Sequence, residues 1–318
     1  MKLLLLSLLY FMFYWHKVTS RLSNAPRNYN LRNGYLKTSI RLYGSNNNNN
    51  NNNKQFLVSI PASDVAACIG RNPYKASSDV FNELWKRWSP DTFTGKTKID
   101  EQLEAISTTT KEEQNLLWTA AKSITKDAEG AMKTFNETST IIESSTTLKE
   151  EDKAKVLDLM KTMLSTSHGT RTEGKVAQKL AMKQGVTITR DNTLYSIPLI
   201  TLGNDDDDDK NNNNKKDFIV RGKIDRLSEE NGEIVLVEVK SRMKRLFKEL
   251  RDYEHIQIQA YLQMLPDIKR AKLVESYLGE THEIWIDKDD DLWQHEIEPA
   301  LLSFCIELHA AMTGLNEE

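Results

Sequence analysis

Residues 218–241, FIVRGKIDRLSEENGEIVLVEVKS, carry the strongest structural signal in the chain. Two runs rich in Val, Ile and Leu flank Asn231 and Gly232. Asn-Gly is the strongest short hairpin signal, because a type I′ turn needs positive φ at both central positions. The register that follows from a two-residue turn places Asp225 opposite Glu238. The sequence therefore predicts an antiparallel hairpin in which two carboxylates face each other.

The facing carboxylates indicate a metal site. Directly opposed side chains have Cβ atoms roughly 4.5–5.5 Å apart, and two like charges at that distance repel unless something neutralises them. Mg²⁺ does so, typically held by one or two carboxylates and by phosphate oxygens. Strand alternation places Lys240 on the same face, where it can help to activate a water or stabilise charge on an attacked phosphate. The competing interpretation is a solvent-exposed hairpin with charges on its wet face, which a short motif alone does not exclude.

The remaining periodicity predicts an α/β fold. Apolar residues at helical spacing indicate helices at 63–69, 78–88, 170–184, 253–265 and 292–312, with two or three more in the polar segment 96–166. Runs rich in Val, Ile, Leu and Tyr indicate strands at 194–202, 218–227, 233–241 and 271–278, with a further candidate at 282–286. We expect Ile234, Leu236 and Val239 to anchor the second hairpin strand. The order of elements favours helices packed on a mixed β-sheet.

Two low-complexity tracts interrupt the chain, at 46–53 and 204–214. Both are rich in Asn or Asp and cannot bury apolar surface, so they are expected to be disordered. Five consecutive Asp residues at 205–209 suggest a calcium site at first sight. Without a turn-forming scaffold, an acidic loop of about 203–216 is the better interpretation.

The charge is distributed unevenly along the chain. Residues 1–63 contain eight Lys or Arg and no acidic residue, a formal charge of +8. Since the whole chain has a formal charge of −3, residues 64–318 carry −11. An acidic body argues against a general nucleic-acid coat protein, which relies on excess positive charge. Two cysteines provide no disulfide framework and favour a reducing compartment. The body has no apolar run of 18 residues, so we expect no stable membrane association of residues 56–318.

The basic leader has the features of a targeting sequence. Residues 1–20 place one Lys before an apolar run of 13 residues, which is typical of a secretory signal and short for a membrane anchor. Residues 21–55 are basic and free of acids, as transit peptides are. A signal followed by a transit-like stretch resembles the two-part presequence of plastids of secondary origin. A mitochondrial presequence, the secretory pathway and an uncleaved anchor are the alternatives.

Four segments together resemble the PD-(D/E)XK nuclease superfamily, in its branch of YqaJ-type viral recombinases and lambda-type alkaline exonucleases. They are, in order, ASDVAACIGRNPY at 62–74, HGTRTE at 168–173, Asp225 with the Glu-Val-Lys at 238–240, and QIQAYLQML at 257–265. Ile224 stands where the motif's proline would be, a common departure. The resemblance covers about 62–90 and 165–285. It implies a restriction-endonuclease-like core in a domain of 56–318, with 96–166 as a helical insertion.

The resemblance also implies roles for individual residues. Asp225 and Glu238 correspond to the metal ligands, with the Val239 carbonyl as a third. Lys240 corresponds to the catalytic lysine, and Glu173 to an additional acid on a helix near the metal or its water. Gln257 corresponds to the glutamine beside the lysine, with Gln259 as the alternative if the other face of the helix turns inward.

Two arginines and two histidines near these motifs need separate interpretation. Arg71 and Arg171 are candidates for contacting DNA phosphates, since a guanidinium matches phosphate bidentately. Ordinary surface arginines are the alternative. His168 and His255 are interpreted as packing residues, because metal-dependent phosphodiesterases need no histidine base.

The resemblance implies a Mg²⁺-dependent deoxyribonuclease, with Mn²⁺ as an alternative metal, most simply an exonuclease on DNA ends in recombination, repair or organelle DNA processing. A structure- or site-specific endonuclease on the same fold is one alternative. A catalytically idle nucleic-acid-binding module and an interaction protein with an acidic hairpin are the others. DNA is the expected partner, bound through metal and a local basic surface, and homo-oligomers are known among such enzymes.

Overall fold

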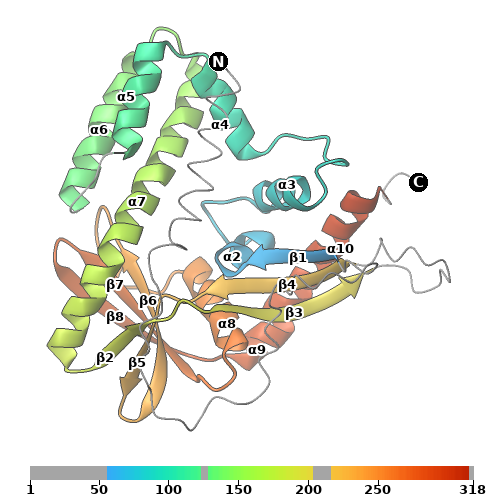
Figure 1. Cartoon of the computed structure of the whole chain (residues 1–318), viewed down its shortest axis with the longest axis vertical. Helices are drawn as coiled ribbons and strands as arrows, with labels where there is room; N and C mark the ends of the chain where they lie inside the picture. Colours follow the sequence, from blue (N-terminus) through green and yellow to red (C-terminus); the bar gives the residue numbers. More distant parts are fainter. Residues whose placement is uncertain (1–55, 123–127, 203–215, 315–318) are drawn as a thin grey trace, which may run out of the picture. The chain divides into compact units, whose positions relative to one another are not determined.

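The computed structural model describes residues 56–122, 128–202 and 216–314 (Figure 1). Along the chain the elements are β1 (Phe56–Pro61), η1 (Ala62–Asp64), α2 (Val65–Cys68), α3 (Ser77–Trp88), α4 (Lys98–Ser107), α5 (Lys111–Lys122), α6 (Ala128–Ser144), α7 (Glu150–Gln184), β2 (Thr187–Arg190), β3 (Leu194–Leu202), β4 (Lys216–Lys223), β5 (Arg226–Glu230), β6 (Glu233–Ser241), α8 (Asp252–Met264), β7 (Arg270–Tyr277), β8 (Glu280–Asp287), α9 (Asp290–Leu292), the π-helical turn η3 (Trp293–Ile297) and α10 (Glu298–Thr313). Helices flank mixed β-sheets, which confirms the predicted α/β fold class. The leader at 1–55 and the tract at 204–214 lie outside the described residues.

The strands form two sheets. One has the order β1-β4-β3, with β1 parallel and β3 antiparallel to β4; the other has the order β2-β5-β6-β7-β8, in which only β6 and β7 are parallel neighbours. The chain passes from one sheet to the other between β4 and β5, at Ile224 and Asp225. The segment 218–227, predicted as one strand, is therefore divided between β4 and β5. The backbone bends at the carboxylate that the motif requires.

The predicted hairpin register is confirmed. In the β5–β6 pair, Arg226 lies opposite Val237 and Glu230 opposite Glu233. Asn231 and Gly232 have φ of 55° and 83°, the positive values that a type I′ turn demands. A one-residue slip would have turned every side chain of β6 to the other face, so this turn sets which side chains reach the site.

The five-stranded sheet is covered on both faces, and each face has its own core. On one face, α7 packs against the sheet through Val176, Leu180, Val237, Val239 and Val274. On the other face, α8 contributes to the main core with buried residues that include Leu236, Ile256, Ala260 and Leu273. Burial on both faces explains why the sequence of β6 is a nearly continuous run of apolar residues. Ile234, expected to anchor this strand, is 48% exposed near the turn.

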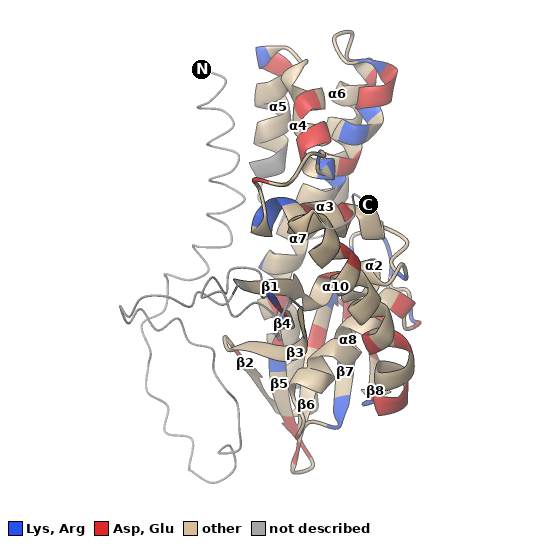
Figure 2. Ribbon diagram, turned by 90° about the vertical axis from the view of Figure 1, so that its right-hand side faces the viewer, with Lys and Arg blue, Asp and Glu red and all other residues tan. Residues whose placement is uncertain are grey.

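The helical segment is joined to the rest of the fold through α7. Helices α4 and α6 pack along α7, away from the strands, and α5 packs on α6 (Figure 1). They share a second core around Ile106, Ile142, Val156 and Met160. These helices carry Lys and Arg as well as Asp and Glu (Figure 2).

The expected end of the helical insertion at 166 falls inside a continuous helix, because α7 runs unbroken over 35 residues through Gly169 and Gly174. A glycine inside a helix costs about 1 kcal/mol, and packing at both ends of α7 offsets this cost. The helix that carries Glu173 therefore also supports α4–α6.

Two further strands, β1 and β2, were not predicted. No helix among the described residues has the length and apolar character that crossing a bilayer requires.

Candidate active site

The break between the sheets places Asp225 beside the end of β6. Its Oδ2 accepts a hydrogen bond from the Val239 backbone N–H at 3.1 Å. Glu238 is only 3% exposed, and its Oε1 lies 2.8 Å from Lys240 Nζ. The three residues of the Asp…Glu-x-Lys motif are thus brought together as the register predicted.

Helix α8 completes this group with Gln257. Its Oε1 accepts from Lys240 Nζ at 3.2 Å, while its Nε2 donates to Glu238 Oε1 and to the Tyr261 hydroxyl, at 3.2 and 3.1 Å. Gln259 lies elsewhere: its amide bonds the backbone of Asp287 and Asp289. Of the two glutamines considered, the structure therefore brings Gln257 into contact with the lysine and the glutamate.

Tyr261 takes part in this arrangement and was not singled out from the sequence, although it lies in the same helix motif. Its ring lies against Gly222 of β4, where a Cβ atom would come within 2.5 Å of Tyr261 Cε1 and 3.0 Å of Ala62 Cβ. A side chain at Gly222 would therefore force α8 away from β4. The glycine thus allows the helix that carries Gln257 to pack closely against β4.

Glu173 approaches the same group from α7, and it is half-buried. Burial raises its pKa, and the nearby Glu238 carboxylate raises it further, whereas Lys240, Arg226 and Arg190 lower it. Among the described residues no hydrogen bond links Glu173 to the other members. It is an electrostatic neighbour of the carboxylate pair and can act on a water or ion bound there.

The carboxylates repel each other in a desolvated setting. Burial and the Asp225 carboxylate raise the pKa of Glu238 to about 7, although Lys240 opposes the shift. The pKa of Asp225 is also raised, by burial and by Glu173. Burial alone would lower the pKa of Lys240, but Glu238 and Asp225 raise it, so the ammonium form is favoured. Displaced acid pKa values in one cluster are typical of functional sites.

The arrangement fits a divalent cation with oxygen ligands. Glu238 Oε2 is buried and has no hydrogen-bond partner among the described residues, which is costly unless a ligand binds it. Within those residues, no three His, Cys, Asp or Glu side chains converge closely enough to hold a metal by themselves. Two carboxylates, with water and substrate oxygens completing the shell, suit Mg²⁺. Asp225 and Glu238 would hold the ion, with the Val239 carbonyl as a candidate third ligand.

The structure does not bring Arg71 into this group. Its guanidinium bonds Asp252 and Glu296, at 2.6 and 2.9 Å, and the Asp252 hydrogen bond raises its pKa despite partial burial. Arg171 is exposed on α7, two residues before Glu173. Phosphate contact by either arginine stays a prediction.

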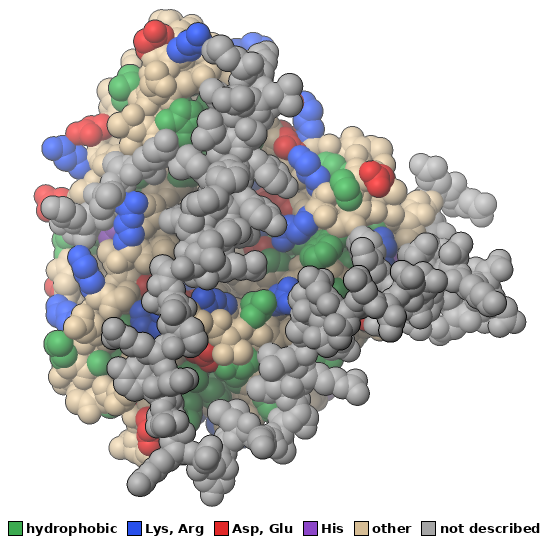
Figure 3. Space-filling model, viewed as in Figure 1, with side chains coloured by type: hydrophobic (Ala, Val, Ile, Leu, Met, Phe, Trp, Pro, Cys, Tyr) green, Lys and Arg blue, Asp and Glu red, His purple; other side chains and the backbone are tan. Residues whose placement is uncertain are grey.

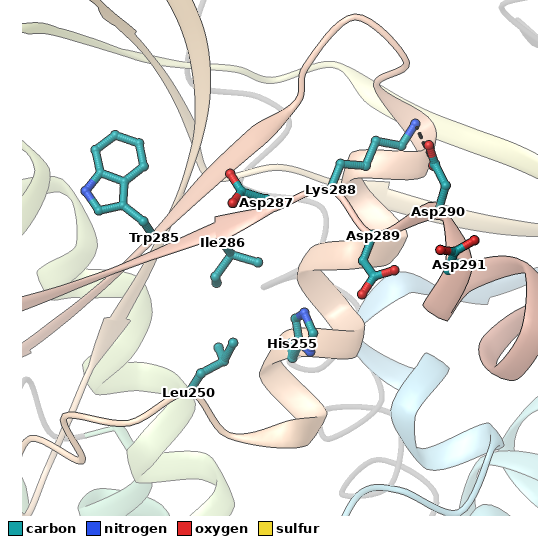
Figure 4. Close-up of a pocket in the computed structure, with 9 residues that line it drawn as sticks. All are labelled: Leu250, His255, Trp285, Ile286, Asp287, Lys288, Asp289, Asp290 and Asp291. Carbon is teal, nitrogen blue, oxygen red and sulfur yellow. Dashed lines mark ion pairs between the residues drawn. The ribbon is translucent and has the colours of Figure 1, made fainter.

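The two histidines lie on α7 and α8. His168 is buried in α7, and His255 Nε2 lies 3.1 Å from Gln259 Nε2. His255 also lines an open pocket with Leu250, Trp285 and acidic residues of 287–291 (Figure 4). None of the residues that line this pocket is Asp225, Glu238, Lys240 or Gln257. This pocket is therefore separate from the residues of the Asp…Glu-x-Lys motif.

Comparison with known protein families identifies the superfamily of this chain. The family model of the PD-(D/E)XK nuclease superfamily matches residues 101–292, more than half of the 318-residue chain. No curated protein gives a significant match. Solved structures with a significant likeness include the crystal structure of SSO0001, with a TM-score of 0.34, 12% identity and coverage of 66% of this chain and 84% of that one. By the family match, this chain belongs to the PD-(D/E)XK nuclease superfamily.

Proposed function

We propose that the protein is a Mg²⁺-dependent deoxyribonuclease that degrades DNA from its ends. The observation that carries this proposal is the contact group of Asp225, Glu238, Lys240 and Gln257. Membership of a nuclease superfamily supports phosphodiester hydrolysis as the reaction class. The resemblance of the N-terminal and α8 motifs to lambda-type exonucleases supports action on DNA ends.

The side chains divide the chemistry among them. A divalent ion between Asp225 and Glu238 would supply charge neutralisation and acidify a water. Lys240 presents an ammonium group next to Glu238, where it can donate to a phosphate oxygen as negative charge develops. Gln257 holds both partners at hydrogen-bond distance and thereby fixes the direction of the lysine. Glu173 can accept a proton from a water on the α7 side.

The loop between β6 and α8 supports a nucleic-acid substrate. It begins directly after the catalytic strand and carries Lys244, Arg245 and Lys248, all exposed and without an ion pair to any described residue. Lys and Arg side chains are also visible across the middle of the molecular face in Figure 3. Such local positive charge can bind a phosphate backbone although the chain as a whole is slightly acidic.

The test uses the full chain with Mg²⁺ on end-labelled linear DNA and on covalently closed circular DNA of the same sequence. We expect degradation of the linear form only, and none with EDTA. Cutting of the circle would identify an endonuclease. Binding without Mg²⁺-dependent turnover would identify an idle binding module.

We further propose, from the two-part leader alone, that the enzyme acts on organelle DNA, with the plastid favoured; organelle fractionation tests this.

A further inference from the structure

Two arginines face each other on the edge of the five-stranded sheet. In the antiparallel pair of β2 and β5, Arg190 lies directly opposite Arg226. Directly opposed residues have Cβ atoms roughly 4.5–5.5 Å apart on the same face, and like charges in that position destabilise the sheet. The pair is therefore unfavourable unless negative charge lies near it, and a bound anion would supply such charge.

No acidic side chain lies at salt-bridge distance from this pair within the described part of the chain, although both arginines act electrostatically on Glu173. Neither Arg190 nor Arg226 forms a salt bridge there, and Arg226 Nε is buried without a hydrogen-bond partner. Arg270, on the same sheet, behaves differently: its Nε lies 2.8 Å from Asp287 and its guanidinium stacks on Trp285. An arginine of this sheet that serves the fold is therefore paired, whereas the facing two are not.

The pair lies next to the carboxylates. Arg226 directly follows Asp225 in the chain, and its Nη2 lies 3.7 Å from the position of a Cβ atom built on Gly174 of α7. Gly174 follows Glu173, and both arginines act electrostatically on that glutamate. The side chains of Arg226 and Val237 are cross-strand neighbours, so Arg226 lies on the α7 face of the sheet.

We propose that Arg190 and Arg226 form a phosphate-binding site that holds a backbone phosphate of the substrate beside the one that is cleaved. This proposal rests on the proposed nuclease function for the identity of its ligand. Guanidinium groups bind phosphate bidentately, and two of them across one strand pair present converging donors to a single anion. A bound phosphate would relieve the repulsion within the pair and satisfy Arg226 Nε. It would also fix the DNA on the Glu173 side of the metal ligands.

The first experiment measures the site without DNA or cleavage. Inorganic phosphate should raise the thermal midpoint of the wild-type full chain, because a ligand that binds the native state stabilises it. The double variant Arg190→Ala/Arg226→Ala should lose this rise. Arg270→Ala, the control arginine of the same sheet, should keep it. An equal rise in the double variant would overturn the site.

The second experiment measures DNA binding in EDTA as a function of salt. Each arginine removed should lower the slope of log affinity against log salt by about 1, and Arg270→Ala should leave it unchanged. If the arginines only supported the fold, the variants would lose stability with an unchanged slope. If the double variant does not fold, the slope of log affinity against log salt is measured for Arg190→Ala alone, because this variant changes an exposed residue.

The outcomes separate the two proposals. A wild-type protein that cleaves DNA, together with an unchanged slope in the variants, would refute the arginine site and leave the nuclease function intact. A wild-type protein without Mg²⁺-dependent cleavage would refute the nuclease function. The response to inorganic phosphate would still decide whether the arginine pair binds that anion.

Discussion

Two groups of buried charges lie near the end of β6, one around Glu238 of that strand and one around Glu275 of the neighbouring β7, and their polar atoms are satisfied to different degrees. Around Glu275, which is fully buried, Arg242 Nε donates to Oε1 at 2.8 Å, and the backbone N–H groups of Phe247 and Lys248 donate to Oε2 at 3.1 and 2.8 Å. Around Glu238, Oε1 is bonded but Oε2 has no described partner. The first glutamate completes a structural network, and the second leaves an oxygen for a ligand.

The structural group shapes the basic loop. Arg242 also bonds Glu254, and its guanidinium and that of Arg251 both lie 4.4 Å from the Phe247 ring centroid. Lys248 adopts a φ of 60°, uncommon for a residue with a side chain, and its N–H bond to Glu275 helps to hold it there. Glu254 and Glu275 therefore build the surroundings of the site, whereas Glu238 keeps one oxygen for a ligand.

The largest expected effect is a difference in the free energy of unfolding between the isosteric variants Glu275→Gln and Glu238→Gln. Removing one member of a buried ion pair costs about 3–5 kcal/mol, so Glu275→Gln should lower the free energy of unfolding by that order. Glu238→Gln at pH 8 should not lower it, because it removes a repelled charge. Urea unfolding of both variants without metal measures the difference. Equal losses would break the distinction between the two groups.

The pH dependence of stability should sharpen the same distinction. A carboxyl whose pKa is raised on folding favours the folded state below its unfolded pKa, and this contribution is lost as the pH rises through the folded pKa. Because the pKa of Glu238 is raised from 4.5 to about 7, the metal-free protein should lose up to about 3 kcal/mol between pH 4.5 and 7 on this account.

The measurement is unfolding in EDTA at a series of pH values. Glu238→Gln should show a shallower decline over this range, and Mg²⁺ should restore stability to the wild type at pH 8 but not to the variant. A decline of the same size in Glu238→Gln would mean that another group causes it.

A smaller effect is expected for the two glutamines of α8, whose alanine variants form a matched pair for measuring cleavage. Gln257→Ala should reduce cleavage roughly tenfold or more, as loss of a residue that orients a metal ligand usually does. Gln259→Ala should lower stability, since its amide bonds the β8–α9 junction, and leave cleavage per folded molecule unchanged. Cleavage rates at saturating DNA, corrected for the folded fraction, test the pair. Equal rates in both variants would contradict the assigned role of Gln257.

Local chemistry allowed much of the site to be predicted. The Asn-Gly turn specifies its own backbone conformation, so the β5–β6 register, which brings Asp225 beside the end of β6, could be obtained from the sequence. The positions of Lys240 and Gln257 followed from strand alternation and from the family resemblance. The split at Ile224 could not be predicted, because an apolar residue before the aspartate fits a continuing strand equally well.

Features that depend on contacts between residues far apart in the sequence could not be predicted. Strand β2 has only four residues, TITR, which is too short for its alternation to indicate a partner strand, so its pairing with β5 and the facing arginines could not be inferred. The unbroken course of α7 depends on packing at both of its ends, which overrides the signal of Gly169. The ion pairs of Arg71 with Asp252 and Glu296 could not be predicted either, because they join residues far apart in the sequence. Phosphate contact by Arg71 stays a prediction.

The most direct test of the central claim is Mg²⁺-dependent cleavage of linear DNA by Asp225→Asn, with folding checked by circular dichroism. Asparagine keeps the shape of the side chain and removes the charge that would bind the ion. We predict a folded protein whose cleavage rate falls by roughly a thousandfold or more, since a catalytic metal contributes several kcal/mol to transition-state stabilisation. A folded variant that cleaves at the wild-type rate would contradict the assignment of Asp225 and Glu238 as the metal site.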